Sequence, residues 1–222
     1  MSLIVYYHPL SSYSWKVLIP LYEKATDFDG RIIDDRHPEN CGAWAALWPM
    51  LRFPVLRDTA RDTTIPETTT IIEYLDLHYP GAWRAIPGDA DTAIEARVLD
   101  RIFDNYVMTP MSTAVFNQIR PEDARDPHGV RQAADMLRRA YDLLETRLAG
   151  RTWAAGDAFT LADCAAAPSL FYADRIVPFR QSHPALATYL SRLEARPSFA
   201  RVLEEKEPYW PNFPFAGGPP NI

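Results

Sequence analysis

The feature that most constrains the fold of this chain is an abrupt change of pattern near residue 79. Before it, short apolar and β-branched runs alternate with segments of helical periodicity. Strands are predicted at 3–7, 28–33, 53–56 and 63–65, with a helical pattern through 17–22 and helices at 43–48 and 67–79. After it the strand signals stop, and helices are predicted at 93–118, 130–148, 161–175, 185–195 and 198–206. The order is therefore βαβ, then ββα, then helices alone.

The segment that separates these two patterns contains Pro80, Gly81, Pro87 and Gly88 and has the composition of a linker. We therefore expect one domain over 1–79, a linker over 80–91 and an all-helical domain over 92–222. The last part of the second domain, PYWPNFPFAGGPPNI, is predicted to form no regular element because it is rich in Pro and Gly. Its aromatic side chains favour packing against the rest of the chain.

Charge and composition exclude several classes of function. The 222 residues carry a net charge of −6, and their 23 basic residues are scattered among 29 acidic ones, so a nucleic-acid partner is not expected. No apolar run is long enough to cross a membrane, and the N-terminus lacks a signal-peptide pattern, so we expect a cytoplasmic protein with no membrane partner. Cys41 and Cys164 are too few for a disulfide framework, and the five histidines lack metal-ligand spacing, so no metal is predicted.

Three hydroxyl side chains, Ser11, Ser12 and Ser14, gather where the first predicted strand passes into a helix. Serine is a favoured N-cap, so these residues are candidates for capping the helix. A helix N-terminus with nearby hydroxyls is also suited to stabilising an anion, because its N–H groups are unpaired and carry partial positive charge. The local pattern leaves both interpretations open.

Together with the order of elements, four motifs resemble those of the soluble glutathione S-transferases. They are HPLSSYSWKV, Phe53-Pro54-Val55, Glu67-Thr68 within PETTTIIEYL, and Phe159-Thr160-Leu161-Ala162-Asp163. The first is similar to the catalytic corner of the Ser-type classes, and its Ser-Ser-x-Ser-Trp is closest to the zeta class. The resemblance covers nearly the whole chain. It implies a thioredoxin-like α/β domain (βαβ-ββα), an all-α helical-bundle domain, a homodimer, and glutathione as co-substrate.

At the first motif, the resemblance makes Ser11 the catalytic residue, which donates a hydrogen bond to the glutathione sulfur. Ser12 is expected to share this contact. The chemistry requires such a donor, since a free thiol with a pKa of ~8.5 is mostly protonated at neutral pH and only the thiolate is a good nucleophile.

At the second motif, the resemblance implies a cis-proline, Pro54, and a preceding residue, Phe53, whose main chain pairs with the cysteinyl main chain of glutathione. An ordinary trans proline at the start of an edge strand is the alternative. Arg52 stands where the family has Lys or Gln, and is expected to bind the glycyl carboxylate; an Arg at the protein surface is the alternative.

At the third motif, Glu67 and Thr68 are expected to bind the γ-glutamyl end of glutathione. A carboxylate complements the ammonium group, while a hydroxyl and helix N–H groups complement the carboxylate. The alternative is a simple helix start, for which Pro66-Glu67 is well suited. The fourth motif is structural: Thr160 and Asp163 form a capping box, and Cys164 next to them is expected to have no catalytic role.

The function predicted from these features is that of a glutathione transferase. The thiolate of glutathione attacks a small hydrophobic electrophile, and the reaction is either conjugation, as in detoxification, or zeta-like isomerisation. A redox enzyme is disfavoured because the corner carries Ser where that chemistry needs Cys. A non-catalytic interaction or sensing module is the alternative, since Tyr13, Trp48 and Leu51 depart from the family pattern. The electrophile is expected near the helix at 93–118, with a kink at Pro110. Its aromatic and Met residues are candidates for either core or pocket: Phe103, Asn105, Tyr106, Met108, Met111 and Phe116.

Overall fold

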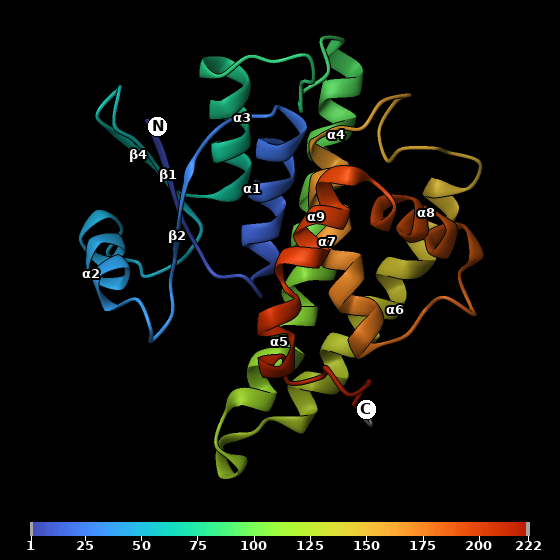
Figure 1. Ribbon diagram of the computed structural model, residues 1–222. Coiled ribbons are helices and arrows are strands. Elements are labelled where there is room, and N and C mark those ends of the chain that lie inside the picture. Colours follow the sequence, from blue (N-terminus) through green and yellow to red (C-terminus); the bar gives the residue numbers. More distant parts are fainter. Residues whose placement is uncertain (1, 221–222) are drawn as a thin grey trace.

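The computed structural model describes residues 2–220 and contains a sheet-bearing part followed by a helical part (Figure 1). The strands are β1 (Leu3–Tyr7), β2 (Asp29–Ile32), β3 (Val55–Asp58) and β4 (Thr63–Ile65). The helices of this part are α1 (Ser12–Glu23), α2 (Pro38–Leu47) and α3 (Thr68–His78). Their order along the chain confirms the predicted thioredoxin-like arrangement. Helix α2 begins five residues before the predicted one, because Pro38 occupies its first turn, where a missing N–H does no harm.

The sheet has the order β2-β1-β3-β4, in which β1 and β2 are parallel and the other two pairs are antiparallel. Tyr6 of β1 pairs with Val55 of β3. Because these two strands run in opposite directions, the end of β1 lies beside the start of β3. The residues that follow β1 and those that precede β3 are thereby brought to the same edge of the sheet.

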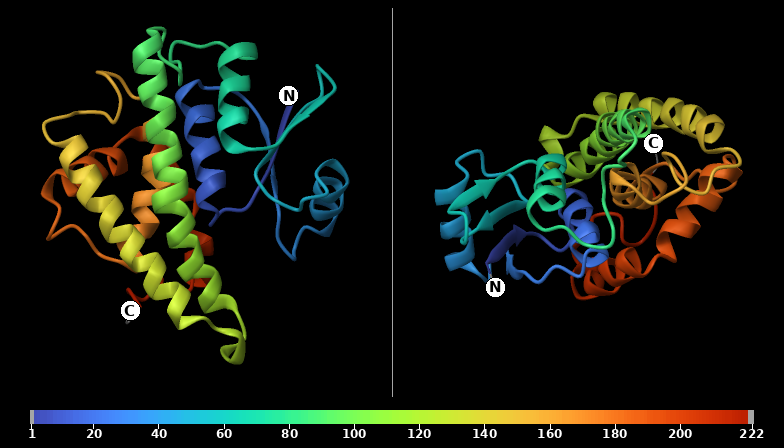
Figure 2. Two further views of the ribbon diagram at one scale, coloured as in Figure 1. Left: turned by 180° about the vertical axis from the view of Figure 1, so that it is seen from behind. Right: turned by 90° about the horizontal axis from the view of Figure 1, so that it is seen from above.

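Alternate residues of β1 face opposite sides of the sheet. Leu3 and Val5 join the main core with α1 and α3, whereas Tyr6 packs with Trp44 of α2 and with Val55. Figure 2 shows the same division, with α2 on the outer side of the sheet and α1 and α3 between the sheet and the helical part. Both faces of the sheet are therefore covered by helices, and α1 lies between the sheet and the helical part of the molecule.

In the described residues after α3, the regular elements are all helices, which are joined by loops. They are α4 (Ala90–Ile102), a π-helical segment η1 (Phe103–Met108), α5 (Thr109–Ile119), a short 3-10 turn η2 (Glu122–Ala124), α6 (Pro127–Leu148), α7 (Leu161–Ile176), α8 (Pro184–Glu194), α9 (Pro197–Glu205) and a 3-10 segment η3 (Glu207–Asn212). Helix α7 is the centre of the bundle, and the capping box of Thr160 and Asp163 at its N-terminus is present. Among residues 2–220, no helix has the length and apolar character needed to cross a membrane.

One long helix over 93–118 with a kink at Pro110 was predicted here, and the structure has a continuous helical run from α4 through η1 to α5. The helix widens into η1, which ends two residues before the proline, and the Thr109 N–H donates to the Asp104 carbonyl, five residues back. Pro110 has no N–H to donate and would clash with the carbonyl four residues before it. An extra residue in the preceding turn relieves this clash and keeps α4 and α5 continuous.

The aromatic tail packs against the bundle, as predicted, although the expectation that it forms no regular element is wrong. Residues 207–212 form η3, after which Phe213 and Phe215 are almost fully buried. Phe213 packs on Trp210 and on Tyr172 of α7. The core is continuous between the two parts of the chain, because Trp15 of α1 packs against Tyr172. The division at 1–79, 80–91 and 92–222 stays a prediction.

Candidate functional site

Ser11 is the N-cap of α1. Its extended backbone (φ −83°, ψ 119°) places its Oγ where it accepts a hydrogen bond from the Ser14 N–H at 3.1 Å. A serine hydroxyl has one proton and two acceptor lone pairs. The cap uses a lone pair and leaves the proton free to be donated. The two interpretations that the sequence left open are therefore compatible with each other.

The other two serines of the corner differ from Ser11. Ser14 is fully buried, and its Oγ accepts a hydrogen bond from the His8 N–H at 3.3 Å, which closes the turn between β1 and α1. Ser12 is the first residue of α1 and is also buried. Ser14 thus has a structural role, and Ser11 is the hydroxyl at the mouth of the corner.

His8 connects this corner to the loop that precedes β3. Its ring stacks on that of Phe53 with centroids 5.9 Å apart. Its Nδ1 accepts a hydrogen bond from the Leu10 N–H at 3.1 Å, so the ring proton of the neutral form is on Nε2. Burial lowers the pKa of His8, which keeps the ring neutral at pH 7. His8 is therefore a packing residue that holds the two loops together, a role that its sequence position alone did not reveal.

The Phe53–Pro54 peptide is cis, as the resemblance implied. The loop is held from behind by Trp44, whose Nε1 donates to the Arg52 carbonyl at 3.1 Å. Among the hydrogen bonds between residues 2–220, none engages the main chain of Phe53. Arg52 is exposed at the same loop, and Leu51 before it has a positive φ of 53°. In the described chain, the loop thus leaves the main chain of Phe53 without a hydrogen-bond partner and exposes the guanidinium group of Arg52.

Glu67 directly precedes α3 and has a φ of 67°, a conformation that non-glycine residues adopt rarely and at an energetic cost. Its side chain is exposed and does not cap α3. Thr68 is the first residue of the helix and is buried. The first N–H groups of α3 have no partner within the helix. This strained turn therefore places a free carboxylate beside a helix N-terminus.

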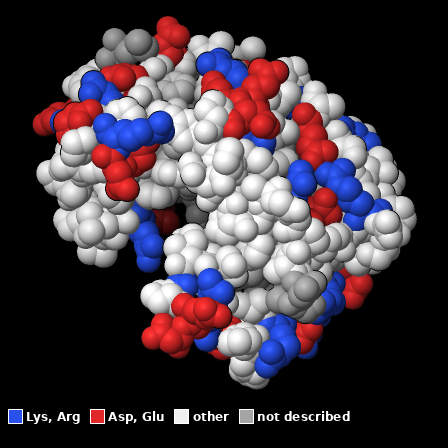
Figure 3. All heavy atoms as spheres, turned by 60° about the horizontal axis from the view of Figure 1, so that its bottom comes forward, with Lys and Arg blue, Asp and Glu red and all other residues white. Residues whose placement is uncertain are grey.

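These three loops meet at one end of the sheet. The pairing of β1 with β3 joins the Ser11 corner to Phe53, and Lys16 of α1 joins it to α3, since its Nζ donates to Thr69 Oγ1 at 3.1 Å. The predicted site residues Ser11, Ser12, Arg52, Phe53, Pro54, Glu67 and Thr68 are thus at one edge of the sheet-bearing part. Figure 3 shows a hollow between this part, at the left, and the helical part, with basic and acidic groups at its rim.

A buried charge cluster behind the corner was not found from the sequence. Lys16 is completely buried, and its Nζ lies 2.6 Å from Asp100 and 2.7 Å from Asp104. Arg101 closes the cluster from the outside at 2.6 Å from each carboxylate. Burial raises the pKa of Asp104, against the lowering effect of Lys16. The cluster joins α1 to α4 and η1. Two sequence signals could have pointed to this cluster: a lysine within the apolar run WKVLIPL, and the two aspartates Asp100 and Asp104 at helical i, i+4 spacing.

Tyr13 lies on the first turn of α1 and faces η1 and α5. Burial raises its pKa, and the Asp104 carboxylate adds to the rise, while the nearby Thr109 hydroxyl opposes it. The phenol therefore stays protonated at neutral pH. It borders the region where the electrophile was expected.

The structure divides the side chains expected near the electrophile into two groups. Phe103, Met108 and Met111 are core residues, whereas Asn105, Tyr106 and Phe116 are exposed. Among the two cysteines, Cys164 is fully buried and burial raises the pKa of its thiol, so it is unsuited to nucleophilic chemistry. Cys41 is partly exposed and its thiol lies 3.4 Å from the Asp34 carbonyl.

Comparisons with known proteins agree with this geometry. Residues 5–83 match the family description "Glutathione S-transferase, N-terminal domain", and residues 107–197 match "Glutathione S-transferase, C-terminal domain". The chain is 29% identical over 215 residues to FtsZ-localized protein A of Caulobacter vibrioides, covering 93% of this chain and 92% of that protein. It is 28% identical over 220 residues to a probable maleylacetoacetate isomerase of Vibrio cholerae, covering 94% and 98%.

Among solved structures, a glutathione S-transferase from Methylobacillus flagellatus with glutathione bound is similar to the chain, with a TM-score of 0.81 and 26% identity. The match covers 90% of this chain and 98% of that one. The similarity therefore extends over both the sheet-bearing and the helical part.

Proposed function

Because the chain belongs to the soluble glutathione S-transferase family, we propose that it is a glutathione transferase in which Ser11 stabilises the thiolate of glutathione for attack on a small hydrophobic electrophile. The observation that carries this proposal is the hydrogen bonding of Ser11. Among the hydrogen bonds between residues 2–220, its Oγ takes part only as the acceptor that caps α1, which leaves the hydroxyl proton available at the corner. A donor in this position lowers the energy of a sulfur anion and does not disturb the helix.

The thiolate is favoured by two effects at the corner. The N-terminus of α1 supplies unpaired N–H groups and partial positive charge, and Ser11 supplies the hydroxyl proton. Lowering the thiol pKa by one unit takes about 1.4 kcal/mol. A hydrogen bond to a charged group contributes about 1.5–3 kcal/mol, so Ser11 alone is sufficient for a shift of one to two units.

The residues at the three loops fit the rest of the tripeptide. The free main chain of Phe53 can pair with the cysteinyl residue, next to Pro54, as one strand pairs with another. Glu67 offers a carboxylate to the γ-glutamyl ammonium, while Thr68 and the N-terminus of α3 offer donors to its carboxylate. Arg52, which is exposed at the same loop as Phe53, is our candidate for binding the glycyl carboxylate, and Ser12 is next to Ser11 in the sequence. The ammonium and the glycyl carboxylate are thereby matched by side chains of opposite charge, and the γ-glutamyl carboxylate by neutral hydrogen-bond donors.

We propose conjugation or isomerisation as the reaction, and the Vibrio cholerae relative, a probable maleylacetoacetate isomerase, favours the second. In conjugation the thiolate forms a carbon–sulfur bond and the leaving group departs with its electron pair. In isomerisation the same bond forms and then breaks again, which regenerates glutathione. The exposed Tyr106 and Phe116 and the half-buried Tyr13 offer aromatic surface to the electrophile. A detoxifying role and a cytoplasmic location stay predictions.

The test measures the pKa of the bound thiol. Calorimetry first establishes glutathione binding, which Glu67→Ala should weaken. The ultraviolet absorbance of the bound thiolate is then followed against pH for the unchanged chain, Ser11→Ala and the conservative Ser11→Thr. We expect a thiol pKa below that of free glutathione, a rise towards it in Ser11→Ala, and retention in Ser11→Thr. Conjugation to 1-chloro-2,4-dinitrobenzene should follow the same order. A low pKa that survives in Ser11→Ala would refute the role of Ser11.

A non-catalytic interaction module is the second candidate. It is favoured by the similarity to FtsZ-localized protein A over nearly the whole chain, and by Tyr13, which departs from the family pattern at the catalytic corner. Glutathione binding with an unchanged thiol pKa, and without turnover of a broad panel of electrophiles, would decide for this candidate.

We further propose that the protein is a homodimer. Three exposed apolar side chains, Leu77 of α3 and Ile94 and Val98 of α4, lie on one surface. The two helices run antiparallel there, since Thr69 bonds to Asp100 and Glu73 pairs with Arg97, each at 2.9 Å, and this direction brings Leu77 towards Ile94. Ile94→Asp with Val98→Asp should give a monomer in sedimentation equilibrium. The equally exposed Ile119→Asp on α5 is the matched control and should stay dimeric. A dimer that survives the double substitution would exclude this interface.

A further inference from the structure

The hydroxyl group of Tyr13 has no role in the chemistry assigned to the corner so far. Tyr13 lies in the first turn of α1, two residues after Ser11, and its side chain is half-buried. A buried tyrosine hydroxyl usually has a hydrogen-bond partner. Among the hydrogen bonds between residues 2–220, however, none involves the hydroxyl of Tyr13. This donor is therefore available to a ligand.

The phenol lies where the sheet-bearing part and the helical part meet. The charged groups near it come from three elements, because Arg101 belongs to α4, Asp104 to η1, and Glu67 to the turn before α3. The hydroxyl of Thr109, at the start of α5, is also nearby. It donates to the Asp104 carbonyl at 2.9 Å, which fixes this wall. Tyr13 thus stands between the proposed glutathione site and the helices near which the electrophile is expected.

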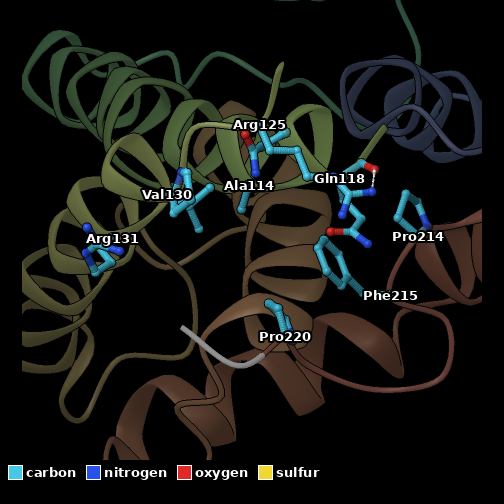
Figure 4. Close-up of a pocket in the computed structure, with 10 residues that line it drawn as sticks. Ala114, Gln118, Arg125, Val130, Arg131, Pro214, Phe215 and Pro220 are labelled. Carbon is cyan, nitrogen blue, oxygen red and sulfur yellow. Dashed lines mark hydrogen bonds between the residues drawn. The ribbon is translucent and has the colours of Figure 1, made fainter. Parts of the chain in front are cut away.

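This place is distinct from a cavity of about 650 Å³ that lies between α5, α6 and the C-terminal tail. Figure 4 shows Ala114 and Phe215 at that cavity, and Tyr13 does not line it. Thr109, which is near the phenol, and Ala114 are five residues apart on α5. Since an α-helix turns by about 100° per residue, their side chains lie about 140° apart around its axis. Tyr13 and the cavity are therefore on different sides of α5.

The charges on the helical side of the phenol balance one another. Lys16 and Arg101 each lie within 2.7 Å of carboxylate oxygens of Asp100 and Asp104. Neither cation is left over for a negative charge that develops on an electrophile beside Tyr13. A neutral hydrogen-bond donor has to stabilise that charge. The phenol is such a donor, because burial raises the pKa of Tyr13 and keeps its proton in place at neutral pH.

We propose that Tyr13 is a further catalytic residue, whose hydroxyl donates a hydrogen bond to the carbonyl oxygen of an electrophile in which a carbon–carbon double bond is conjugated with that carbonyl. The preferred substrates are accordingly α,β-unsaturated carbonyl compounds. This assignment rests on the proposed function, because the thiolate has to form at Ser11 before it attacks.

The charge that Tyr13 stabilises arises when the thiolate attacks the β-carbon. A carbon–sulfur bond forms, the π bond between the α- and β-carbons breaks, and the electron pair moves to the carbonyl oxygen as an enolate. This oxygen is three bonds from the attacked carbon, so its donor has to be a different group from the sulfur donor Ser11. In conjugation, the α-carbon then takes from solvent a proton equivalent to the one that the thiol released. In isomerisation, the carbon–sulfur bond breaks again and the double bond returns.

The test compares two electrophiles that react with the same thiolate. 4-Phenylbut-3-en-2-one develops charge on its carbonyl oxygen, whereas benzyl chloride has no carbonyl and releases chloride. Tyr13→Phe should lower kcat/KM for the enone about tenfold to a hundredfold, because loss of one such donor in an enclosed site costs about 10²–10³-fold and Tyr13 is only half-buried. For benzyl chloride, kcat/KM should change less than about twofold, because the phenol makes no contact specific to that transition state.

Tyr209→Phe is the matched control, since it removes the hydroxyl of another half-buried tyrosine, on η3. It should change neither kcat/KM value. The pKa of the bound glutathione thiol, followed by ultraviolet absorbance, should be the same in Tyr13→Phe as in the unchanged chain. A thiol pKa that rises in Tyr13→Phe would assign the phenol to the sulfur and overturn the proposal.

The two electrophiles also distinguish failure of this proposal from failure of the proposed function. An unchanged kcat/KM for the enone in Tyr13→Phe, or equal losses for both electrophiles, would overturn the role of Tyr13, while turnover of benzyl chloride still supports the transferase. Turnover of benzyl chloride without turnover of the enone would overturn the substrate class. If neither electrophile reacts, the proposed function fails and the role of Tyr13 fails with it.

Discussion

The hydroxyl of Tyr172 donates a hydrogen bond to the Leu10 carbonyl at 2.8 Å, and so ties the central helix α7 to the residue that precedes Ser11. The indole Nε1 of Trp15 donates to the neighbouring Pro9 carbonyl at 2.6 Å. Both aromatic side chains are almost completely buried and pack on each other. The corner that carries Ser11 is therefore fixed by two buried donors, one from each part of the molecule. Such preorganisation keeps the Ser11 hydroxyl in place before any ligand arrives.

Tyr172→Phe should reduce the free energy of unfolding and should raise the pKa of the bound glutathione thiol. It removes the donor and leaves the Leu10 carbonyl without this partner in a partly buried position, which costs about 1 kcal/mol. Urea unfolding measures the loss of stability, and the pKa of the bound glutathione thiol measures the effect on the corner. Tyr106→Phe is the control, because Tyr106 is about half exposed, and it should change neither quantity. Equal stabilities of the two variants would contradict the role of the Tyr172 hydrogen bond.

Ser11→Asp should separate capping from catalysis. Aspartate is as good an N-cap as serine, so stability should stay within about 0.5 kcal/mol of the unchanged chain, whereas Ser11→Ala should lose about 1 kcal/mol. An ionised carboxylate has no proton to donate and repels a thiolate, so conjugation should fall at least as far as in Ser11→Ala. Thermal unfolding and kcat/KM are measured on all three proteins. Full activity in Ser11→Asp would show that the hydroxyl proton is not used.

Lys16→Met should be among the most destabilising single substitutions at the contact between α1 and α4. It leaves the Asp100 and Asp104 carboxylates buried with only Arg101 near them, and breaking a buried ion pair in this way costs about 3–5 kcal/mol. Arg138→Met is the matched control, because the Arg138–Asp135 pair is exposed on both sides and such pairs contribute about 0–1 kcal/mol. Denaturant unfolding compares the two variants. A loss below about 1 kcal/mol in Lys16→Met would mean that the cluster does not hold α1 to α4.

The free energy of unfolding should decrease as the pH falls below about 4, because Asp58 takes up a proton there. Burial opposes the ionisation of Asp58, but hydrogen bonds from Tyr79 at 2.5 Å and Tyr74 at 2.8 Å lower its pKa to about 2. Because the folded-state pKa lies below the usual 3.8, the ionised group stabilises the fold above about pH 4, and this is lost as the pH falls towards 2. A shift of this size corresponds to about 2 kcal/mol.

The measurement for Asp58 is the free energy of unfolding at pH 2–6 for the unchanged chain and for Asp58→Asn. The variant should be less stable at pH 6 and should show a flatter dependence on pH below 4, since it has no proton to take up. The control is Asp135→Asn, whose carboxylate is exposed. Parallel pH profiles for the unchanged chain and Asp58→Asn would exclude this assignment.

The pattern of the chain was sufficient to predict the kind of fold and where most of its elements lie. Strand β1 has the predicted bounds, and α6 to α9 begin within three residues of the predicted positions. The reason is that strand alternation, helical periodicity and capping residues such as Thr160 act over a few neighbouring positions, so they are legible in the sequence. The family motifs predicted which residues form the candidate site. The roles of these residues stay predictions.

Tertiary structure decided the features that depend on residues far apart in the chain. Lys16 meets Asp104 across 88 positions, and Tyr172 meets Leu10 across 162, so no local pattern could reveal either contact. The same holds for the C-terminal tail, where Phe213 packs on Tyr172 of α7. The sequence by itself determined which segments are helices and strands, since local hydrogen bonding and sterics govern them. Packing between those segments determined which charges are buried and how the corner that carries Ser11 is held, because burial depends on neighbours that only the fold supplies.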